Sequence, residues 1–233
     1  YGAVHISGAA RVNGQAMRDA LIYSAQKHGA KCIEGDATLI KSGSSIDGVV
    51  VNNNIHHAEK VIVTSGVWAR KLIQPLGMTF HVTSQKAQIV HLHLPNTITA
   101  DWPVVIPPYN QYILAFEHGK IVIGTTHEDN KGFDNRATVS AVQSIIDKAL
   151  RVAPGLANST YIQTKVGFRP FTPGYLPVFG SVPGVDSLVI ANGLGASGLT
   201  SGPYLGAELA KYVLEESTEL PFEDYNVSGA LSF

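Results

Sequence analysis

The stretch Gly167–Pro203, GFRPFTPGYLPVFGSVPGVDSLVIANGLGASGLTSGP, decides how the rest of the chain is interpreted. Arg169 stands in an otherwise apolar strand pattern, and a loop rich in Pro and Gly follows it. The apolar run Leu188–Ala191 has turn residues on both sides, which predicts a short buried strand. Glycines then cluster, and a helical pattern runs from about Leu199 to Glu215. The stretch therefore predicts a strand, a glycine turn and the start of a helix.

The glycine turn has two interpretations. Gly193, Gly195 and Gly198 spell GxGxxG, and a helix that starts at such a turn has unpaired N–H groups that can bind an anion. A dinucleotide fingerprint also needs a second strand that ends in an acid roughly 20 residues further on. Here the acids near Glu215 stand at a helix end with no strand before them. The plain Rossmann pattern therefore fails, and glycines that serve only a tight turn and close helix packing remain an alternative.

Hydrolase and metal chemistry find little support. A nucleophile elbow around Ser197 needs GxSxG, but Leu199 holds the last position and no histidine follows His127. His91 and His93 share one face of a strand pattern, yet two imidazoles are too few for a zinc site, so we expect a solvated strand face. We therefore assign neither a catalytic residue nor a metal ligand.

Composition sets the broad class. Hydrophobic residues make up 45% of the chain and charged residues 15%, which supports a substantial core. The net charge of −1 gives no electrostatic case for nucleic acid or an anionic membrane, and no apolar run approaches the ~20 residues of a membrane span. The single cysteine, Cys32, lies in an apolar run, so we expect it in the core; it excludes an internal disulfide and favours a reducing, cytoplasmic location. A homo-oligomer is compatible with this composition.

Hydrophobic periodicity predicts the other elements. Asn13 caps a helix from Gln15 to His28, and Thr138 caps a second helix that ends at Ala153. The expected strands are Lys31–Glu34, a meander of Ala37–Lys41, Gly48–Asn52 and Ile55–Ala58, Val61–Thr64 buried on both faces, two long alternating strands Phe80–Leu94 and Gln111–Thr125, and Tyr161–Phe171.

Several segments, taken in order, resemble the C-terminal signature of the D-amino-acid oxidase superfamily of FAD-dependent oxidoreductases, with glycine oxidase and the D-amino-acid dehydrogenases as the nearest relatives. They are Gly167-Phe168-Arg169-Pro170, Thr172-Pro173, Leu176-Pro177 and Gly180, then a strand, the Gly-rich loop and Pro203. The segment VIVTSGVW, residues 61–68, is similar to the family's strand that ends in a small-Gly-x-Trp turn. The family commonly has Asp-Gly at Gly174-Tyr175 and often His at Leu194, and these departures concern the substrate more than the fold.

The resemblance implies an α/β (α+β) fold: the remainder of a Rossmann-like FAD domain with a β-meander, plus an inserted substrate domain with a mostly antiparallel sheet. We expect a partial FAD-binding domain over residues 1–78, a substrate-binding domain over 79–171, and a return to the FAD-binding domain over 172–233. In the family, an N-terminal βαβ unit with its own GxGxxG holds the ADP half of FAD. We expect this chain to be the C-terminal two-thirds of a longer flavoprotein, inactive without that N-terminal FAD-binding segment.

The resemblance also implies a flavin site. Lys86 resembles a basic residue that passes the flavin ring and would stabilise charge on reduced flavin, with a surface lysine as the alternative. Thr38 resembles the position whose backbone meets the adenine, and the backbone of residues 194–200 would face the pyrimidine of reduced FAD. The expected cofactor-binding residues are Thr38, Ser65, Gly66, Trp68, Lys86, Leu194, Gly195, Ala196, Ser197, Gly198, Leu199 and Thr200.

Two residues are substrate candidates. Arg169 lies between apolar neighbours, where arginine is rarely buried unless it is paired, and its planar fork suits a carboxylate. The alternative is a structural ion pair with an internal acid; the resemblance implies a clamp for the α-carboxylate of an amino acid. Tyr112 is similar in place to a family tyrosine near the substrate, although Tyr109 competes for that role and a half-buried aromatic is the alternative.

The implied function is an FAD-dependent oxidoreductase that oxidises an amino acid or amine by hydride transfer to flavin, with Arg169 binding the substrate carboxylate. The substrate would be a small molecule. The competing class is a non-enzymatic α+β binding or interaction module with a glycine-rich surface loop.

Overall fold

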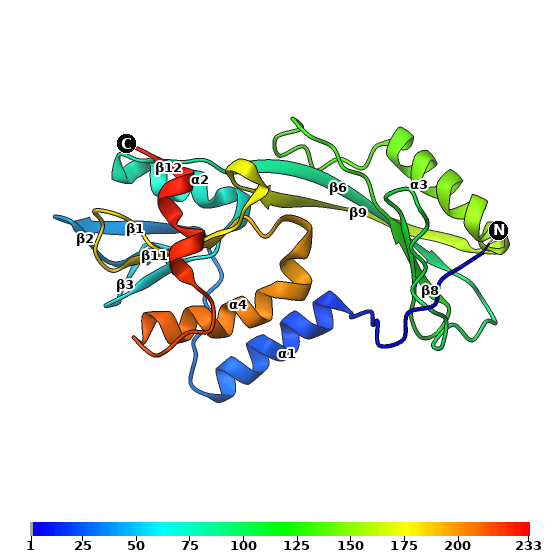
Figure 1. Cartoon of the computed structure of the whole chain (residues 1–233), viewed down its shortest axis with the longest axis horizontal. Helices are drawn as coiled ribbons and strands as arrows, with labels where there is room; N and C mark the ends of the chain where they lie inside the picture. Colours follow the sequence, from blue (N-terminus) through cyan, green and yellow to red (C-terminus); the bar gives the residue numbers. More distant parts are fainter. Residues whose placement is uncertain (1) are drawn as a thin grey trace. The chain divides into compact units, whose positions relative to one another are not determined.

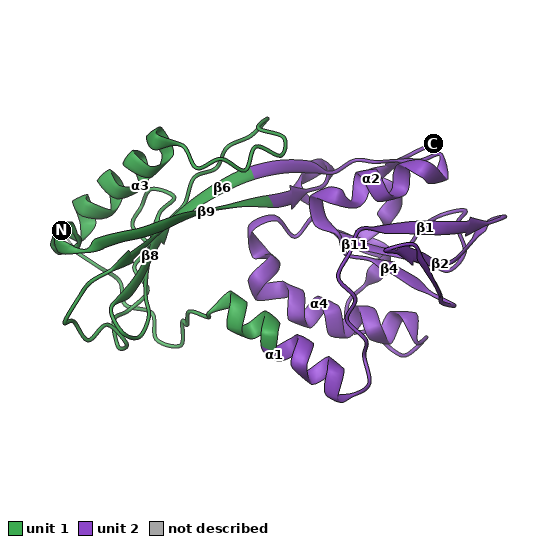
Figure 2. Ribbon diagram, turned by 180° about the vertical axis from the view of Figure 1, so that it is seen from behind, with its two compact units in different colours: residues 1–19, 86–168 green, residues 20–85, 169–233 purple. Residues whose placement is uncertain are grey.

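The computed structural model describes residues 2–233 and shows a mixed α/β fold with antiparallel sheets (Figure 1). The chain divides into two compact units (Figure 2). Unit 1 comprises Tyr1–Asp19 and Lys86–Phe168, and unit 2 comprises Ala20–Gln85 and Arg169–Phe233. No helix within residues 2–233 is long and apolar enough to cross a membrane.

Unit 2 contains three small sheets. The strands β1 (Ala37–Ser42), β2 (Ser45–Val51) and β3 (Asn54–His57) form an antiparallel meander in chain order, as predicted. A second sheet has the order β10-β11-β4, and β5 pairs with β12 in the third. The bounds are β4 (Val61–Val63), β5 (Thr79–Phe80), β10 (Val178–Ser181), β11 (Leu188–Asn192) and β12 (Leu231–Ser232).

Strand β11 is central to unit 2 because both of its faces are buried. Leu188 and Ile190 belong to one apolar cluster, and Val189 and Ala191 belong to another. The second cluster includes Leu205 and other residues of α4 (Gly198–Val213). The predicted buried strand and the helix that follows it are therefore confirmed.

Unit 1 is built on a four-stranded sheet with the order β7-β8-β6-β9. The strands are β6 (Thr83–His93), β7 (Tyr112–Ala115), β8 (Lys120–Gly124) and β9 (Thr160–Phe171), of which β6 and β9 also contribute residues to unit 2. Helix α3 (Val139–Val152) packs Ile145 and Ala149 against Val90, Ile121 and Ile123 of the sheet (Figure 1).

The remaining helices are short, except for the first. They are α1 (Gly14–Lys27), α2 (Ala69–Ile73) and the 3-10 turns Gly66–Trp68, Gln74–Leu76, Pro154–Asn158, Pro173–Tyr175, Gly195–Ser197, Phe222–Tyr225 and Val227–Ala230. None of the residues of α1 is buried. Asn13 caps α1 as expected, because its side chain accepts a hydrogen bond from the Ala16 N–H at 3.2 Å.

Two strand predictions near the N-terminus are wrong. Residues 31–34 form no strand, since no strand of residues 2–233 pairs with them, and Cys32 is exposed rather than in the core. Strand β4 is not buried on both faces: Val61 and Val63 face the core, whereas Ile62 is 40% exposed.

The expected long strands of unit 1 are also interrupted. The run Gln111–Thr125 is a hairpin, because the chain reverses where His118 and Gly119 adopt positive φ values of 58° and 70°. The run Phe80–Leu94 breaks into β5 and β6, since β5 pairs with β12 instead. Thr138 does stand at the N-cap of α3, but its side chain makes no capping bond; its hydroxyl accepts a hydrogen bond from Gln88.

Candidate functional site

The candidate site lies at one edge of the β10-β11-β4 sheet. Strands β4 and β11 are parallel, with Leu188 opposite Val61 and Ile190 opposite Val63. Their carboxyl ends therefore meet at the same edge, which is where open α/β sheets bind ligands. The segment Ser65–Trp68 follows β4, and Gly193–Thr200 follows β11. We refer to these two segments together as the loop edge.

Asn192 ties the two segments together. Its buried side chain donates from Nδ2 to the Gly66 carbonyl at 2.8 Å, and its Oδ1 accepts from the Gly193 N–H at 2.8 Å. The sequence analysis did not identify this residue. The available signal was an amide side chain at the end of an apolar strand, directly before a glycine, because a buried amide needs hydrogen-bond partners.

The first two glycines of GxGxxG are required by the fold. Gly193 and Gly195 have φ values of 85° and 52°, a region that glycine adopts readily. A Cβ on Gly193 would also collide with Thr172 Oγ1, and one on Gly195 would collide with the ring of Phe171. At these two positions the interpretation as a tight, closely packed turn is correct.

The third glycine differs. Gly198 has an ordinary helical φ of −55°, and an added Cβ would have only Leu194 Cβ as a neighbour, at 3.9 Å, among the described residues. It is the first residue of α4, and the preceding Ser197 gives the helix no side-chain cap. N–H groups at the start of a helix can bind an anionic or electron-rich ligand. Leu194 and Gly195 are half-buried, whereas Ala196, Ser197, Leu199 and Thr200 are exposed.

A buried hydroxyl on the other segment gives a second sign of a ligand. Ser65 Oγ is shielded from solvent and has no hydrogen-bond partner within residues 2–233. Buried polar atoms are usually paired, so an orphaned one at a loop edge fits a missing acceptor or donor. Trp68, on the same segment, is 55% exposed. Together with the open space at Gly198, these residues fit the ring of a flavin.

Arg169 is half-buried at the C-terminal end of β9, in unit 2. Its Nη1 donates to the Gln85 side-chain oxygen of β6 at 3.0 Å. The neighbouring Thr83 hydroxyl donates to the Phe171 carbonyl at 3.2 Å, so two side-chain bonds join β6 to β9 here. One hydrogen-bond partner of Arg169 is therefore a neutral amide.

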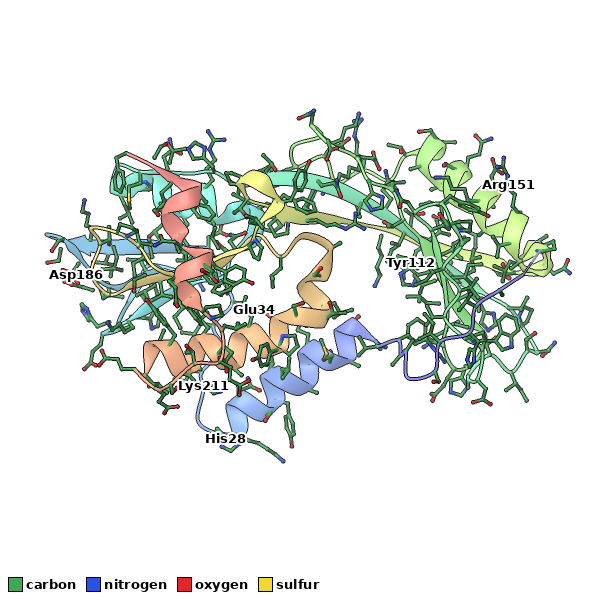
Figure 3. The ribbon with its side chains drawn as sticks, in the orientation of Figure 1. His28, Glu34, Tyr112, Arg151, Asp186 and Lys211 are labelled. Carbon is green, nitrogen blue, oxygen red and sulfur yellow. The ribbon has the colours of Figure 1, made fainter. Side chains whose placement is uncertain are left out.

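Tyr112 belongs to the sheet of unit 1 (Figure 3). It is half-buried in β7, directly opposite Gly124 of β8. A Cβ on Gly124 would come within 3.0 Å of the Tyr112 hydroxyl, so glycine leaves room for this side chain. The competing Tyr109 donates its hydroxyl to the Lys148 carbonyl of α3 at 3.4 Å.

Lys86 is not a surface lysine. It is fully buried in unit 1, and its Nζ donates to the Arg136 carbonyl at 2.7 Å and pairs with Asp134 Oδ2 at 3.3 Å. Hydrogen bonds from Arg136, and a weaker one from Lys86, hold the pKa of Asp134 well below its usual range. The expected cofactor residue Thr38 is exposed in β1 of the meander and is not part of the loop edge.

Gln88 extends the buried polar group around Lys86. Its Nε2 donates to Glu128 Oε1 at 2.8 Å and to Thr138 Oγ1 at 3.2 Å, and its Oε1 accepts from the Thr138 N–H at 3.0 Å. We call Lys86, Gln88, Glu128, Asp134 and Thr138 the Lys86 cluster. The cluster fixes the loop that leads into α3.

The histidine pair lies elsewhere on this sheet. His91 and His93 are half-buried, so the expected solvated face is wrong. Burial, with a smaller contribution from Lys165, lowers the pKa of His91. Residues 2–233 contain no group of three or more His, Cys, Asp or Glu side chains that could hold a metal ion.

Comparison with known proteins identifies the class. Residues 1–212 match the family model described as "DAO: FAD dependent oxidoreductase". The chain therefore belongs to the DAO family of FAD-dependent oxidoreductases, which confirms the resemblance to glycine oxidase-like flavoproteins.

Individual relatives sharpen this result. The chain is 52% identical over 233 residues to the "Uncharacterized oxidoreductase YurR" of Bacillus subtilis (strain 168) and covers 63% of that protein. It is 28% identical to the glycine oxidase of Pseudomonas aeruginosa over 205 residues, which are 86% of this chain and 55% of that enzyme.

Solved structures agree with the family assignment. The crystal structure of iminodiacetate oxidase from Chelativorans sp. BNC1 matches with a TM-score of 0.91 and 40% identity, over 95% of this chain and 60% of that one. Glycine oxidase from Geobacillus kaustophilus matches with a TM-score of 0.80 and 25% identity, over 90% and 56%. The chain thus spans less than two-thirds of the length of these relatives.

Proposed function

We propose that the protein containing this chain oxidises an amino acid or amine, with FAD as the hydride acceptor and Arg169 as the ligand of the substrate carboxylate. The observation that carries this proposal is the loop edge: an open Gly198 at an uncapped helix start, beside an orphaned Ser65 hydroxyl. Family membership supports the cofactor, and the names of the relatives suggest small amines that carry carboxylates.

The loop edge would hold the flavin ring. Ser65, Gly66 and Trp68 would contact it from one segment, and residues 194–200 from the other. When bound, FAD would accept a hydride from the carbon next to the substrate nitrogen, leaving an imine that water hydrolyses. The N–H groups at the start of α4 would stabilise negative charge on the pyrimidine edge. Because Lys86 Nζ is already bonded inside unit 1, we leave it out of the proposed contacts.

Arg169 and Tyr112 would act on the substrate. A guanidinium binds a carboxylate through two parallel N–H bonds, which fixes orientation as well as charge. Arg169 would fix the carboxylate in this way, and Tyr112 would order the substrate or gate its entry. The neutral amine of the substrate would then present its α-hydrogen to the ring.

The proposed domain assignment is testable on the chain itself. We propose residues 1–78 and 172–233 as parts of the FAD-binding domain, residues 79–171 as the substrate domain, and Thr38 as a contact of the adenine. An additional N-terminal segment would supply most of the contacts to the ADP half. We therefore expect the 233-residue chain to lose flavin during gel filtration; stoichiometric retention would refute the assignment.

One experiment tests the function as a whole. Full-length protein is purified and inspected for flavin absorbance, then screened anaerobically with amino acids and secondary amines, including glycine and iminodiacetate. We expect a yellow protein that is bleached by at least one of them. A colourless protein that does not take up added FAD would favour the non-enzymatic binding module.

A further inference from the structure

A second hydroxyl of unit 2 has the same environment as the hydroxyl of Ser65. Ser84 of β6 is half-buried, and its Oγ is shielded from solvent without a hydrogen-bond partner among residues 2–233. A hydroxyl has one donor and two acceptor lone pairs, and burying it without a partner is unfavourable. Two such hydroxyls in one unit indicate a common polar partner, provided that they lie near each other.

The position of Ser84 follows from the pairing of β6 with β9, which are neighbours in the sheet (Figure 1). The Gln85 side chain accepts a hydrogen bond from Arg169. Two residues earlier on β6, Thr83 donates to the carbonyl of Phe171, which is two residues later on β9. The two strands therefore run antiparallel here, and Ser84 stands opposite the residue that precedes Phe171.

That residue, Pro170, connects Ser84 to the loop edge. Opposite residues of an antiparallel pair present their side chains on one face, so Ser84 and Pro170 share a face. An added Cβ on Gly66 would contact Pro170 Cγ at 3.8 Å, which places the residue after Ser65 against this proline. Ser65 and Ser84 therefore lie in one neighbourhood of unit 2, next to the same proline.

We infer that Ser84 is a further flavin-contacting residue, whose hydroxyl and that of Ser65 bond to polar atoms of the same ring. Hydrogen bonds to the ring nitrogens of a flavin tune its electronics, and reduction makes the polar edge richer in electrons. A hydroxyl that donates there stabilises the reduced form. The inference rests on the proposed function, because it adds a residue of β6 to the flavin site at the loop edge.

A flavin contact and a structural hydroxyl have different effects on stability. Without flavin, the Ser84 hydroxyl is a shielded polar group with no partner, so its replacement by a methyl group removes an unfavourable term. With flavin bound, the same replacement removes a hydrogen bond. Ser84→Ala should therefore affect the apoprotein and the flavin-loaded protein in opposite directions. A hydroxyl that is held by a structural water would stabilise both forms.

The test uses full-length protein before and after its flavin is removed. The variants are Ser84→Ala, Ser84→Cys, Ser65→Ala and a control, Ser217→Ala, which makes the same change at an exposed position of unit 2. Cysteine keeps a side chain of similar shape but is a weaker donor. The thermal midpoint of both forms, the Kd for FAD added to the apoprotein and the midpoint potential of the bound flavin are measured.

We expect Ser84→Ala to weaken FAD binding by about three- to tenfold, the scale of one hydrogen bond, and Ser84→Cys by less. The thermal midpoint of the Ser84→Ala apoprotein should equal or exceed that of the wild type. Its bound flavin should be harder to reduce, because a donor to the electron-rich ring is lost. Ser65→Ala should change FAD binding in the same direction, and Ser217→Ala should stay within about twofold.

Two results would overturn the inference. If Ser84→Ala binds FAD as tightly as the wild type, the hydroxyl does not contact the ring. If the substitution lowers the thermal midpoints of the apoprotein and the flavin-loaded protein equally, the hydroxyl is structural. Failure of the proposed function is distinguishable, because the wild type and Ser217→Ala would then bind no FAD either. If the wild type binds FAD and the Ser84 variants match it, the function survives without Ser84.

Discussion

The Lys86 cluster of unit 1 and the loop edge of unit 2 use polar groups in opposite ways. In the cluster, both N–H groups and the oxygen of the Gln88 amide are bonded within the chain, and Lys86 Nζ meets a carboxylate and a carbonyl. At the loop edge, Ser65 Oγ has no partner within residues 2–233 and Ser197 leaves α4 uncapped. Buried groups that satisfy one another stabilise a fold, whereas unsatisfied ones beside open space indicate a ligand.

We expect the largest effect from Gly198→Val, a substitution at the loop edge that should cause loss of flavin. The structure has room for an added Cβ, so we expect a folded full-length protein that has lost most of its flavin because valine occupies the ligand's space. Flavin absorbance per protein and the thermal midpoint measure the two parts. Gly229→Val is the matched control, since that glycine is exposed and also has open space. If the Gly198→Val protein is fully yellow and active, the glycine loop does not contact the flavin ring. If it unfolds outright, Gly198 is needed for packing.

Arg169→Lys should reduce substrate binding while leaving the flavin in place. Lysine keeps the charge and loses the fork, so we expect a cost of about 1.5–3 kcal/mol in substrate affinity, the scale of a charge-assisted hydrogen bond. Steady-state kinetics with the best substrate gives this value. If the flavin-loaded variant has unchanged kinetics, Arg169 has a structural role, like the residues of the Lys86 cluster.

Lys86→Met should lower the stability of the protein and leave ligand binding unchanged, the opposite of what we expect for Arg169→Lys. Methionine removes the donor to the part-buried Arg136 carbonyl. An unsatisfied buried acceptor costs about 1–3 kcal/mol in free energy of unfolding, so we expect a loss at the lower end of this range. Chemical denaturation of the full-length protein measures this loss. Flavin and substrate binding should not change; a selective loss of either, without loss of stability, would give Lys86 a role at the site.

The smallest expected effect concerns His91, one of two exceptions in unit 1, because its buried Nε2, like Oε1 of Gln111, has no hydrogen-bond partner within residues 2–233. Burial lowers its pKa, so the unfolded chain binds the proton more readily than the folded one. Stability from this group is present above pH 6.5 and is lost as the pH falls through the lowered folded-state value. Unfolding measured between pH 8 and pH 5 should therefore show a smaller pH slope for His91→Gln. An identical slope would contradict this.

Hydrophobic periodicity predicted elements that depend on neighbouring residues. It did not predict contacts between residues that are far apart in the sequence. The buried β11, the meander and α3 follow from periodicity over a few residues. The burial of Lys86 does not, because its partner Asp134 is 48 residues away. Arg169 was identified from its apolar neighbours, but Gln85 was not, since the two are 84 residues apart in sequence.

The glycine loop shows the same limit at single positions. The motif GxGxxG treats its three glycines alike, yet only Gly193 and Gly195 have positive φ and a crowded Cβ position. Whether a Cβ fits at these positions depends on the packing of Thr172 and Phe171, which no spacing rule encodes. The sequence therefore predicted the location of the turn, and the structure was needed to separate the two fold-determining glycines from Gly198.

The exposure of α1 has a consequence for amide hydrogen exchange. Helices of about 14 residues are marginal in water unless packing stabilises them, and α1 buries none of its side chains, whereas α3, of equal length, buries three. In the isolated chain, deuterium should therefore replace the backbone protons of residues 14–27 through local fraying, long before those of residues 139–152 open. The exchange rate of α3 would then be an internal reference. A molecule that covers α1 would be detected as slower deuterium uptake by residues 14–27.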